Sequence, residues 1–467
     1  MTGADRVVGV DLGGSSVKVW IAGPDGVRQR SAPLTATRPT PARTEFDPAD
    51  WWATVRREVR ALVDEAGHPA GAYLGLVVSS MRQAFVLVDD RRELGPGILN
   101  PDRRGGPALD RLRALPWLYR TTGHWPAPEL TLGKLLTVAA EEPDRWAATR
   151  RMLFVHDWIV WRLTGEQATE VSYACAGQLA DVARRAWADD LLAELGLDTG
   201  RLARLVEPGT VVGGLTDDGL GLPVGLPVHA GCGDTQLAAM GAGGLAESVV
   251  TVVAGSSTPV QVATDRALVD PECRPWVSTH ARSDLWAAET NAGYPGTMAH
   301  WLRRMLGPVE RSGRPGAGGL TAVTATPHWT EHDWSTKAPM TVLGLGPSTG
   351  PEDLAQAFDE AHAYAVRANL ADLEEIQARP AARVVLTGGA AESLAPLLAD
   401  LLDRPVEVCP GANGTARAGW ALVTGEKVTG EDVRLVEPTL GPDPYAAGYQ
   451  RYLETHAVLR DRLAEED

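Results

Sequence analysis

The sequence predicts a two-lobed α/β protein with a ligand bound between the lobes. Its 467 residues exceed the usual size of one domain, and its apolar content of 44% is sufficient for large cores. A strand followed by a glycine turn recurs near residues 13, 255 and 388. This repetition favours two related lobes, and ligands commonly bind where such lobes meet.

The first part of the chain is rich in strand signals. Residues 6–21 (RVVGVD, LGGSS, VKVWI) indicate strand, glycine turn and strand, and the GPDG stretch at residues 23–26 predicts a hairpin. Residues 51–66 have helical spacing and follow an Asp-Pro pair, which is a helix-start signal. The apolar runs at residues 73–79 and 85–89 have the length of buried strands.

Helices are expected next, and then strands again. Residues 123–202 are predicted to be mostly helical, whereas residues 246–254 form a β-rich run. Residues 384–386 indicate a strand that leads through two glycines into an amphipathic helix. Residues 307–319 resemble a loop or linker, and no short-period repeat indicates a solenoid.

Composition excludes several classes of function. A net charge of −16 argues against a nucleic-acid binder, although backbone N–H groups can still hold a nucleotide phosphate. The four cysteines lie far apart and form no zinc or disulfide pattern. We expect a cytoplasmic protein, because neither a signal peptide nor an apolar stretch of membrane-spanning length is evident.

Three segments have the composition of a phosphate cradle, in which glycine permits close approach and hydroxyl groups donate hydrogen bonds. They are Gly13, Gly14, Ser15 and Ser16, with Lys18 close behind; Gly255, Ser256 and Ser257; and Gly388, Gly389 and Ala390. None is a P-loop or a dinucleotide fingerprint. Each could alone be an ordinary turn, but their recurrence favours phosphate binding.

The order of motifs along the chain resembles the FGGY family of carbohydrate kinases, in the actin-like ATPase superfamily. DLGGSSVK resembles the family's first phosphate segment, and TEFDPADWW resembles its ExxPxxWW stretch. Residues 122–182 reproduce an ordered family block, and GCGDTQLAAMGAG resembles the segment with the catalytic aspartate. AGSSTP, LTGGAAES and NGTARAGWAL resemble the second phosphate segment, the adenosine segment and the closing helix.

This resemblance implies two ribonuclease H-like (actin-like ATPase) domains with a cleft between them. Residues 1–243 would hold the acceptor site and the first phosphate segment, and residues 244–467 would hold the second phosphate and adenosine segments. It also implies ATP-dependent phosphorylation of a small ketose or polyol, with ATP and Mg²⁺ in the cleft. A small carbohydrate is then the expected partner, with no nucleic acid or membrane, and relatives of this kind are often homodimers.

By the same resemblance, Asp234 is the general base and also holds the acceptor hydroxyl, and Asp11 positions Mg²⁺ through water. The serines of the first two segments would donate to phosphate, and the third segment would let adenosine lie against the backbone. Lys18 is either a phosphate ligand or a solvated strand lysine. Ser393 either binds nucleotide or caps a helix, and Asn413 either closes the base pocket or belongs to a turn.

The acceptor pocket departs from the family pattern. Arg82 and Gln83 occupy the position of an arginine–glutamate pair in glycerol kinases, with Gln83 in place of the acid. Asn100 replaces a tryptophan that often walls the pocket, and Trp125 is a candidate apolar wall. Glu129 could meet hydroxyls or an amino group, or be an ordinary loop glutamate.

These departures leave alternatives open. The acceptor could be a cyclitol or a modified sugar, and a nucleotide- or sugar-binding sensor without turnover is a candidate of a different class. The block at residues 122–182 argues against a chaperone or polymer-forming ATPase.

Overall fold

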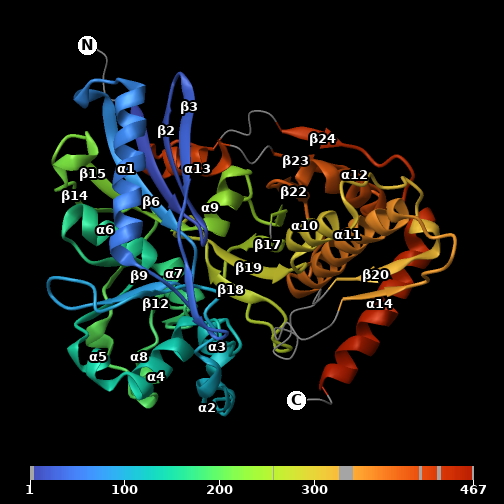
Figure 1. Cartoon of the computed structure of the whole chain (residues 1–467), viewed down its shortest axis with the longest axis horizontal. Coiled ribbons are helices and arrows are strands. Elements are labelled where there is room, and N and C mark those ends of the chain that lie inside the picture. The colour runs from blue at the N-terminus through green and yellow to red at the C-terminus, as the bar shows by residue number, and fades with distance from the viewer. Residues whose placement is uncertain (1–4, 256, 325–339, 410–412, 429–432, 465–467) are drawn as a thin grey trace.

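The chain forms two lobes around two large sheets in a computed structural model (Figure 1). The structure describes residues 5–255, 257–324, 340–409, 413–428 and 433–464. The first sheet has the order β14 (Val211–Gly214), β15 (Pro227–Gly233), β6 (Tyr73–Ser80), β1 (Arg6–Leu12), β2 (Ser16–Gly23) and β3 (Gly26–Pro33). The second has the order β18 (Trp276–Thr279), β19 (Trp286–Asn291), β17 (Pro259–Thr264), β16 (Val249–Val253), β22 (Arg383–Thr387), β23 (Val406–Val408) and β24 (Arg434–Val436).

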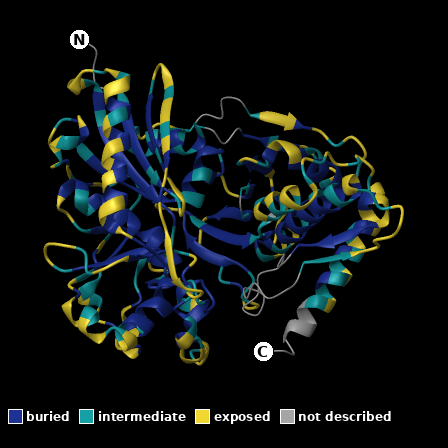
Figure 2. Cartoon of the chain, viewed as in Figure 1, coloured by how far each residue is buried: buried dark blue, intermediate teal, exposed yellow. Residues whose placement is uncertain are grey.

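The centre of the first sheet is parallel, because β1 pairs with β6 and β6 pairs with β15 in the same direction. β1 and β6 are rich in Val and Leu, β15 consists mostly of small residues, and all three are buried almost throughout, as strands covered on both faces should be (Figure 2). Their carboxyl ends therefore meet at one edge. The helices packed on this sheet are α1 (Pro48–Ala66), α6 (Val155–Thr164), α9 (Asp234–Gly241) and α13 (Gly414–Thr424).

The second sheet is built around the parallel pair β16 and β22. Its long helix α11 and the following α12 share one apolar core with these strands. The helices of this lobe are α10 (Pro295–Leu306), α11 (Pro351–Ile376), α12 (Ala391–Leu402) and α14 (Asp443–Ala464), and its short strand pair is β20 (Thr321–Val323) with β21 (Thr341–Leu343).

A third sheet and a group of short helices extend the first lobe below its main sheet (Figure 1). The sheet has the order β4 (Thr37–Thr40), β5 (Arg43–Phe46), β8 (Gly97–Ile98), β7 (Phe85–Val88) and β9 (Arg151–Phe154). The short helices are α2 (Leu109–Arg113), α3 (Leu118–Thr122), α4 (Thr131–Glu141), α5 (Pro143–Ala148), α7 (Val171–Ala176) and α8 (Asp189–Glu194), and the short strand pairs are β10 (Ala168–Glu170) with β13 (Arg204–Val206) and β11 (Ala180–Asp181) with β12 (Ala186–Trp187).

The sequence halves are not fully separate, because α13 packs on the first sheet (Figure 1). A Cβ on Gly419 of this helix would lie 2.5 Å from the indole ring of Trp20 in β2, so only glycine fits there. The domain limit at 243/244 stays a prediction.

The elements predicted at residues 6–21, 51–66, 73–79, 85–89, 246–254 and 384–386 are present with shifted ends, whereas residues 123–202 contain the strands β9 to β12 as well as the expected helices. Helix α1 begins three residues earlier than predicted, with Asp47 as N-cap and Pro48 in its first turn. Strand β16 begins at Val249 rather than at residue 246. In the described ranges, no helix combines the length and apolarity needed to cross a membrane.

Candidate active site

Asp234 is the first residue of α9 and directly follows β15. The apolar run of β15 carries the chain to the sheet edge, where Gly233 starts the helix. The Asp234 Oδ1 accepts hydrogen bonds from the N–H of Thr235 at 2.8 Å and from its hydroxyl at 3.2 Å. Burial raises the pKa of Asp234, and the nearby Arg82 opposes this shift. The carboxylate is therefore more basic than an exposed aspartate.

Asp11 lies at the end of the parallel strand β1, in the electric field of Asp234. Ser79 in β6 donates its hydroxyl to Asp11 Oδ1 at 3.0 Å, and Lys18 lies opposite Asp11 in the β1–β2 ladder. Burial, followed by repulsion from Asp234, raises the pKa of Asp11 to about 6. A cation beside these two carboxylates would stabilise their ionised forms.

This pair fits a magnesium ion held mainly by water and phosphate. Across the residues that the structure describes, no group of three or more histidine, cysteine, aspartate or glutamate side chains is placed to hold a metal. Mg²⁺ commonly takes only one or two carboxylates and keeps water and substrate phosphates as its other ligands. Asp11 suits that arrangement.

Arg82 reaches from the first lobe to Glu289 in β19 of the second sheet. Its Nη2 donates to Glu289 Oε1 at 2.8 Å and its Nη1 to Oε2 at 3.3 Å. The two side chains are 11% and 7% exposed, so water screens this ion pair only weakly. The sequence reasoning predicted Arg82 but missed Glu289. The sequence does single out Glu289 in one way, as the charged residue among the uncharged residues of the strand WAAETN.

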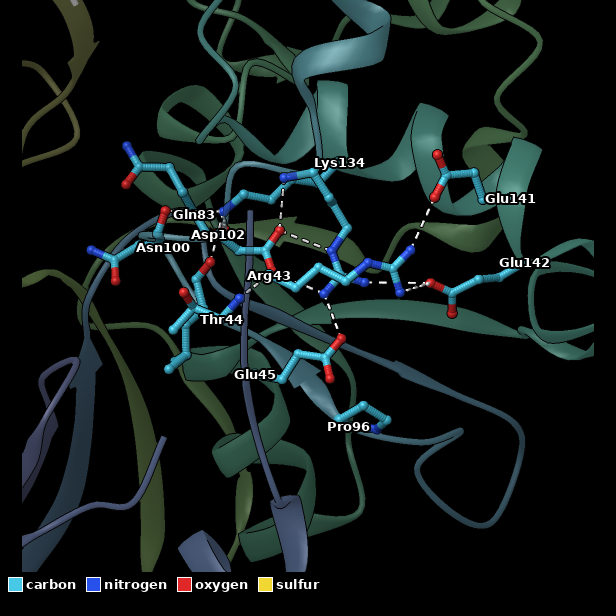
Figure 3. Close-up of polar contacts among 12 residues, drawn as sticks. Arg43, Thr44, Glu45, Gln83, Pro96, Asn100, Asp102, Lys134, Glu141 and Glu142 are labelled. Carbon is cyan, nitrogen blue, oxygen red and sulfur yellow. Dashed lines mark hydrogen bonds and ion pairs between the residues drawn. The ribbon is translucent and has the colours of Figure 1, made fainter. Parts of the chain in front are cut away.

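Lys134 of α4 holds Gln83 and Asn100 together (Figure 3). The Lys134 ammonium donates to three carbonyl oxygens, those of Gln83 at 3.3 Å, Leu99 at 2.8 Å and Asn100 at 3.2 Å. Gln83 has a φ of 63°, which is uncommon outside glycine. The Thr131 hydroxyl also donates to its carbonyl, at 3.2 Å. These contacts fix the predicted acceptor segments at residues 83 and 100, and sequence reasoning missed Lys134.

Charged side chains are buried beneath these segments. Burial lowers the pKa of Lys134 to about 7, while Asp102 and Glu129 oppose the shift and Arg104 adds to it. Arg104 in turn binds Asp102 at 2.8 Å and Glu45 at 2.5 Å. The predicted acceptor segments therefore rest on a network of buried charges rather than on an apolar floor.

Trp125 and Glu129 approach the second lobe. The Trp125 side chain is 1% exposed, and its ring centroid lies 5.3 Å from that of Trp276 in β18 and 6.4 Å from that of Tyr119. Its indole Nε1 has no hydrogen-bond partner among the described residues. Glu129 pairs with Arg103 at 3.1 Å. Trp125 thus forms part of an aromatic wall between the lobes, and acceptor contact by Trp125 and Glu129 stays a prediction.

The first predicted phosphate segment is an exposed tight turn between β1 and β2. The Gly13 N–H donates to the Ser16 carbonyl at 2.9 Å, and the side chains of Ser15 and Ser16 are exposed. A Cβ on Gly14 would lie 3.5 Å from Asn100 Oδ1, a buried atom that has no partner within the described ranges. The turn therefore lies beside the predicted acceptor segment at Asn100.

The second segment follows β16. Gly255 donates its N–H to the Ser257 carbonyl at 3.1 Å, and Ser256 lies outside the described residues. The hydroxyl of Thr258 lies 3.0 Å from Nε2 of His362 in α11. Burial lowers the pKa of His362 to about 3, so this histidine is a neutral anchor for the segment.

The third segment lies against the second, because β22 runs parallel to β16. Gly388 has a φ of 98°, and a Cβ there would lie 2.5 Å from the Ala254 carbonyl oxygen. The Ala390 N–H donates to that carbonyl at 3.0 Å. At Gly389, by contrast, a Cβ would meet no described atom within 4 Å. Ser393 donates its hydroxyl to the Ala390 carbonyl at 3.0 Å, within the first helical turn.

Asn413 lies just before α13. It lines a cavity of about 290 Å³ between this helix and the β2–β3 hairpin, together with Gly23, Arg417 and Trp420. Contact between Asn413 and an adenine base stays a prediction.

Glu170 and Ser172 hold the backbone that precedes Asp234, and sequence reasoning missed both. The Ser172 hydroxyl accepts from the Gly233 N–H at 3.0 Å and donates to Glu170, whose other oxygen accepts from the Ser172 N–H at 3.1 Å. Burial raises the pKa of Glu170 to about 8. Tyr173 donates to the Cys232 carbonyl at 2.8 Å. In the sequence, Ser172 and Tyr173 stand out as the polar residues among the small and apolar residues of α7.

The glycines that precede Asp234 lie against neighbouring parts of the fold. A Cβ on Gly231 would lie 2.1 Å from the Val78 carbonyl oxygen, so this glycine permits the close approach of β6. A Cβ on Gly233 would lie 2.6 Å from Gln236 Oε1 and 3.0 Å from Arg82 Cδ. In the part of the chain that is described, both amide atoms of the buried Gln236 lack hydrogen-bond partners.

The chain matches known proteins over most of its length. The model for the N-terminal domain of the FGGY family of carbohydrate kinases matches residues 6–241, and the C-terminal domain model matches residues 250–425. Xylulose kinase of Escherichia coli (strain K12) is 27% identical, covering 98% of this chain and 99% of that protein. An autoinducer-2 kinase of Yersinia enterocolitica is 25% identical, covering 91% and 86%. The crystal structure of a xyloylose kinase from Brucella ovis superposes with a TM-score of 0.89 at 26% identity, covering 98% and 99%.

Proposed function

Because the chain belongs to the FGGY family of carbohydrate kinases, we propose that it uses ATP to phosphorylate a hydroxyl of a small ketose or polyol. Relatives named xylulose kinase make xylulose the first acceptor to test. The autoinducer-2 kinase relative, together with the altered pocket, keeps a modified sugar or a cyclitol as a second candidate.

The observation that carries this proposal is the half-buried Asp234 carboxylate, with its raised pKa, at the edge where three parallel strands end. Asp234 takes the proton of the acceptor hydroxyl. The oxygen of that hydroxyl bonds to the γ-phosphorus, while the bond from the γ-phosphorus to the bridging oxygen breaks and ADP leaves. A base in this position typically contributes about 10²–10⁴-fold to the rate. Most of the remaining acceleration comes from positioning and charge stabilisation.

The glycine segments would bind the nucleotide. Ser15 and Ser16 offer exposed hydroxyl donors to the phosphates, as Ser257 does from the second lobe, and the backbone at Gly389 is open enough for adenosine to lie on it. Mg²⁺, when bound beside Asp11 through water, would neutralise charge on the phosphate oxygens. Lys18 lies close enough to Asp11 to lower its pKa and is placed to favour anionic phosphate as well.

The acceptor would lie between the segments that Lys134 holds and the second lobe. We assign its binding to Arg82, Gln83 and Asn100, with Trp125 as an apolar wall and Glu129 at its margin. Closure of the lobes would exclude water and so limit ATP hydrolysis.

A panel of ketoses, polyols and cyclitols, assayed for ADP release, tests this function. We expect at least one neutral carbohydrate to be phosphorylated well above the rate of ATP hydrolysis alone. If ATP binds tightly but none of these acceptors is phosphorylated, the kinase proposal fails for these classes and a non-catalytic sensor is favoured.

A further inference from the structure

The ion pair between Arg82 and Glu289 lies beside the proposed base. The Arg82 stem packs over the residue before Asp234, since a Cβ on Gly233 would lie 3.0 Å from Arg82 Cδ. Arg82 and Asp234 are also close enough to interact electrostatically. The guanidinium that Glu289 grips therefore belongs to the same pocket as the reacting hydroxyl.

A buried arginine without such a partner would be a strong carboxylate or phosphate site. Its planar fork donates two parallel hydrogen bonds and is always charged. Here both donors face Glu289, at 2.8 and 3.3 Å, and both side chains are almost fully shielded from water. A carboxylate on the acceptor would have to displace Glu289 and leave that charge buried and unpaired, which is costly.

The other charges near the pocket do not favour an anionic acceptor. Asp234 and Asp11 are both acidic, and Glu129 is paired with Arg103. His124, which lies near enough to feel the charge of Arg82, stays neutral because burial lowers its pKa to about 3. Lys18 faces Asp11 on the phosphate side. A carboxylate placed beside Asp234 would therefore meet the like charges of Asp234 and Asp11, while the ammonium of Lys134 is taken up by three backbone carbonyls.

We propose that Glu289 is a specificity-determining residue, which occupies the fork of Arg82 and thereby restricts the kinase to acceptors without a carboxylate. The inference rests on the proposed function. Its chemical basis is repulsion of the wrong substrate rather than an added contact to the right one. Neutral polyols and ketoses can still bind, because a hydroxyl can donate to Glu289 or accept from Arg82 without breaking the pair.

Matched neutral and acidic acceptors test this assignment: xylitol against D-xylonate, and D-glucitol against D-gluconate. For the intact protein we expect kcat/KM for the neutral member of a pair to exceed that for the acid by about a hundredfold, because like charges placed together in a shielded pocket repel each other. In Glu289→Gln this ratio should fall by about tenfold or more, because Arg82 becomes free to bind the acid. Equal use of both members by the wild type, or an unchanged ratio in the folded variant, would overturn the inference.

A matched control makes the same substitution in an arginine–glutamate pair outside the site. Glu407→Gln removes a carboxylate from another arginine pair of the same sheet, with Arg383, and should leave the ratio unchanged. Thermal melting checks that each variant is folded. If Glu289→Gln does not fold, the selectivity of the wild type still tests the inference. If no acceptor is phosphorylated, the proposed function fails, and calorimetry with D-xylonate and D-gluconate still decides the inference. Tighter binding of an aldonate to Glu289→Gln than to the wild type supports it, and equal binding refutes it.

Discussion

The ammonium group of Lys134 lies 2.8 Å from the carbonyl oxygen of Leu99, although the Lys134 side chain is completely buried (Figure 3). The same group reaches the carbonyls of Gln83 and Asn100. Burying a charge is unfavourable unless hydrogen bonds satisfy it, and here all three N–H donors have carbonyl partners. One side chain thus ties together two segments that we assign to the acceptor pocket.

Replacing Lys134 by Met should therefore damage acceptor binding more than nucleotide binding. Met keeps much of the volume but removes the three donors, so the segments at residues 83 and 100 lose a shared anchor. We expect KM for the acceptor to rise about ten- to hundredfold, with KM for ATP within about twofold, because small misplacements of binding groups have large effects. Steady-state kinetics with each substrate varied separately measures this split. Arg38→Met, at an exposed cationic side chain of β4, is the control, and equal changes in both KM values would contradict the prediction.

The sequence predicted helices and strands well where a short local pattern of residues indicates them. The runs RVVGVDL and YLGLVVSS are apolar enough to be strands in almost any fold, and the glycines after the first run mark a turn. Asp11 and Asp234 were identified because their segments resemble family motifs, and the segment at Gly388 because two glycines follow an apolar run.

Partners that are distant in the chain were not predictable. Glu289 meets Arg82 across 207 residues and Ser172 meets Gly233 across 61, and no local pattern encodes such pairings. Lys134 falls in an amphipathic helix where a lysine would ordinarily face solvent. Gly231 shows a second limit. A glycine can indicate that another group comes close to the backbone, but the sequence does not say that this group is strand β6.

Asp234→Asn should slow turnover strongly and leave ATP affinity nearly unchanged. Asn preserves size and the hydrogen bond from Thr235 but cannot take a proton at neutral pH. We expect kcat to fall about 10²–10⁴-fold, the usual contribution of a general base. ADP release and ATP binding by calorimetry are the measurements. Asp47→Asn, at the N-cap of α1 where Asn caps equally well, should retain activity, and near-normal turnover in Asp234→Asn would refute the base assignment.

Glu170 should make stability fall as pH rises from about 4.5 to about 8. Its folded pKa of about 8 lies above the ordinary 4.5, so the folded state binds the proton more tightly. The resulting stabilisation is complete below the unfolded pKa and is lost as pH rises through the folded pKa. Glu170→Gln cannot ionise, so its free energy of unfolding relative to wild type should rise between pH 5 and pH 8, as measured by urea denaturation. The exposed Glu166→Gln is the control, and parallel wild-type and Glu170→Gln profiles would contradict the assignment.

Adjacent glycines at 388 and 389 offer a test that separates folding from nucleotide binding. Gly388→Ala should destabilise the protein by about 1–3 kcal/mol or more, because φ is 98° and the new Cβ would lie 2.5 Å from the Ala254 carbonyl. Gly389→Ala should leave the melting temperature nearly unchanged, since its Cβ meets no described atom within 4 Å. If adenosine lies on this backbone, Gly389→Ala should nevertheless weaken ATP binding about tenfold, measured by calorimetry. Wild-type ATP affinity in Gly389→Ala would place the nucleotide elsewhere, and wild-type stability in Gly388→Ala would refute the steric argument.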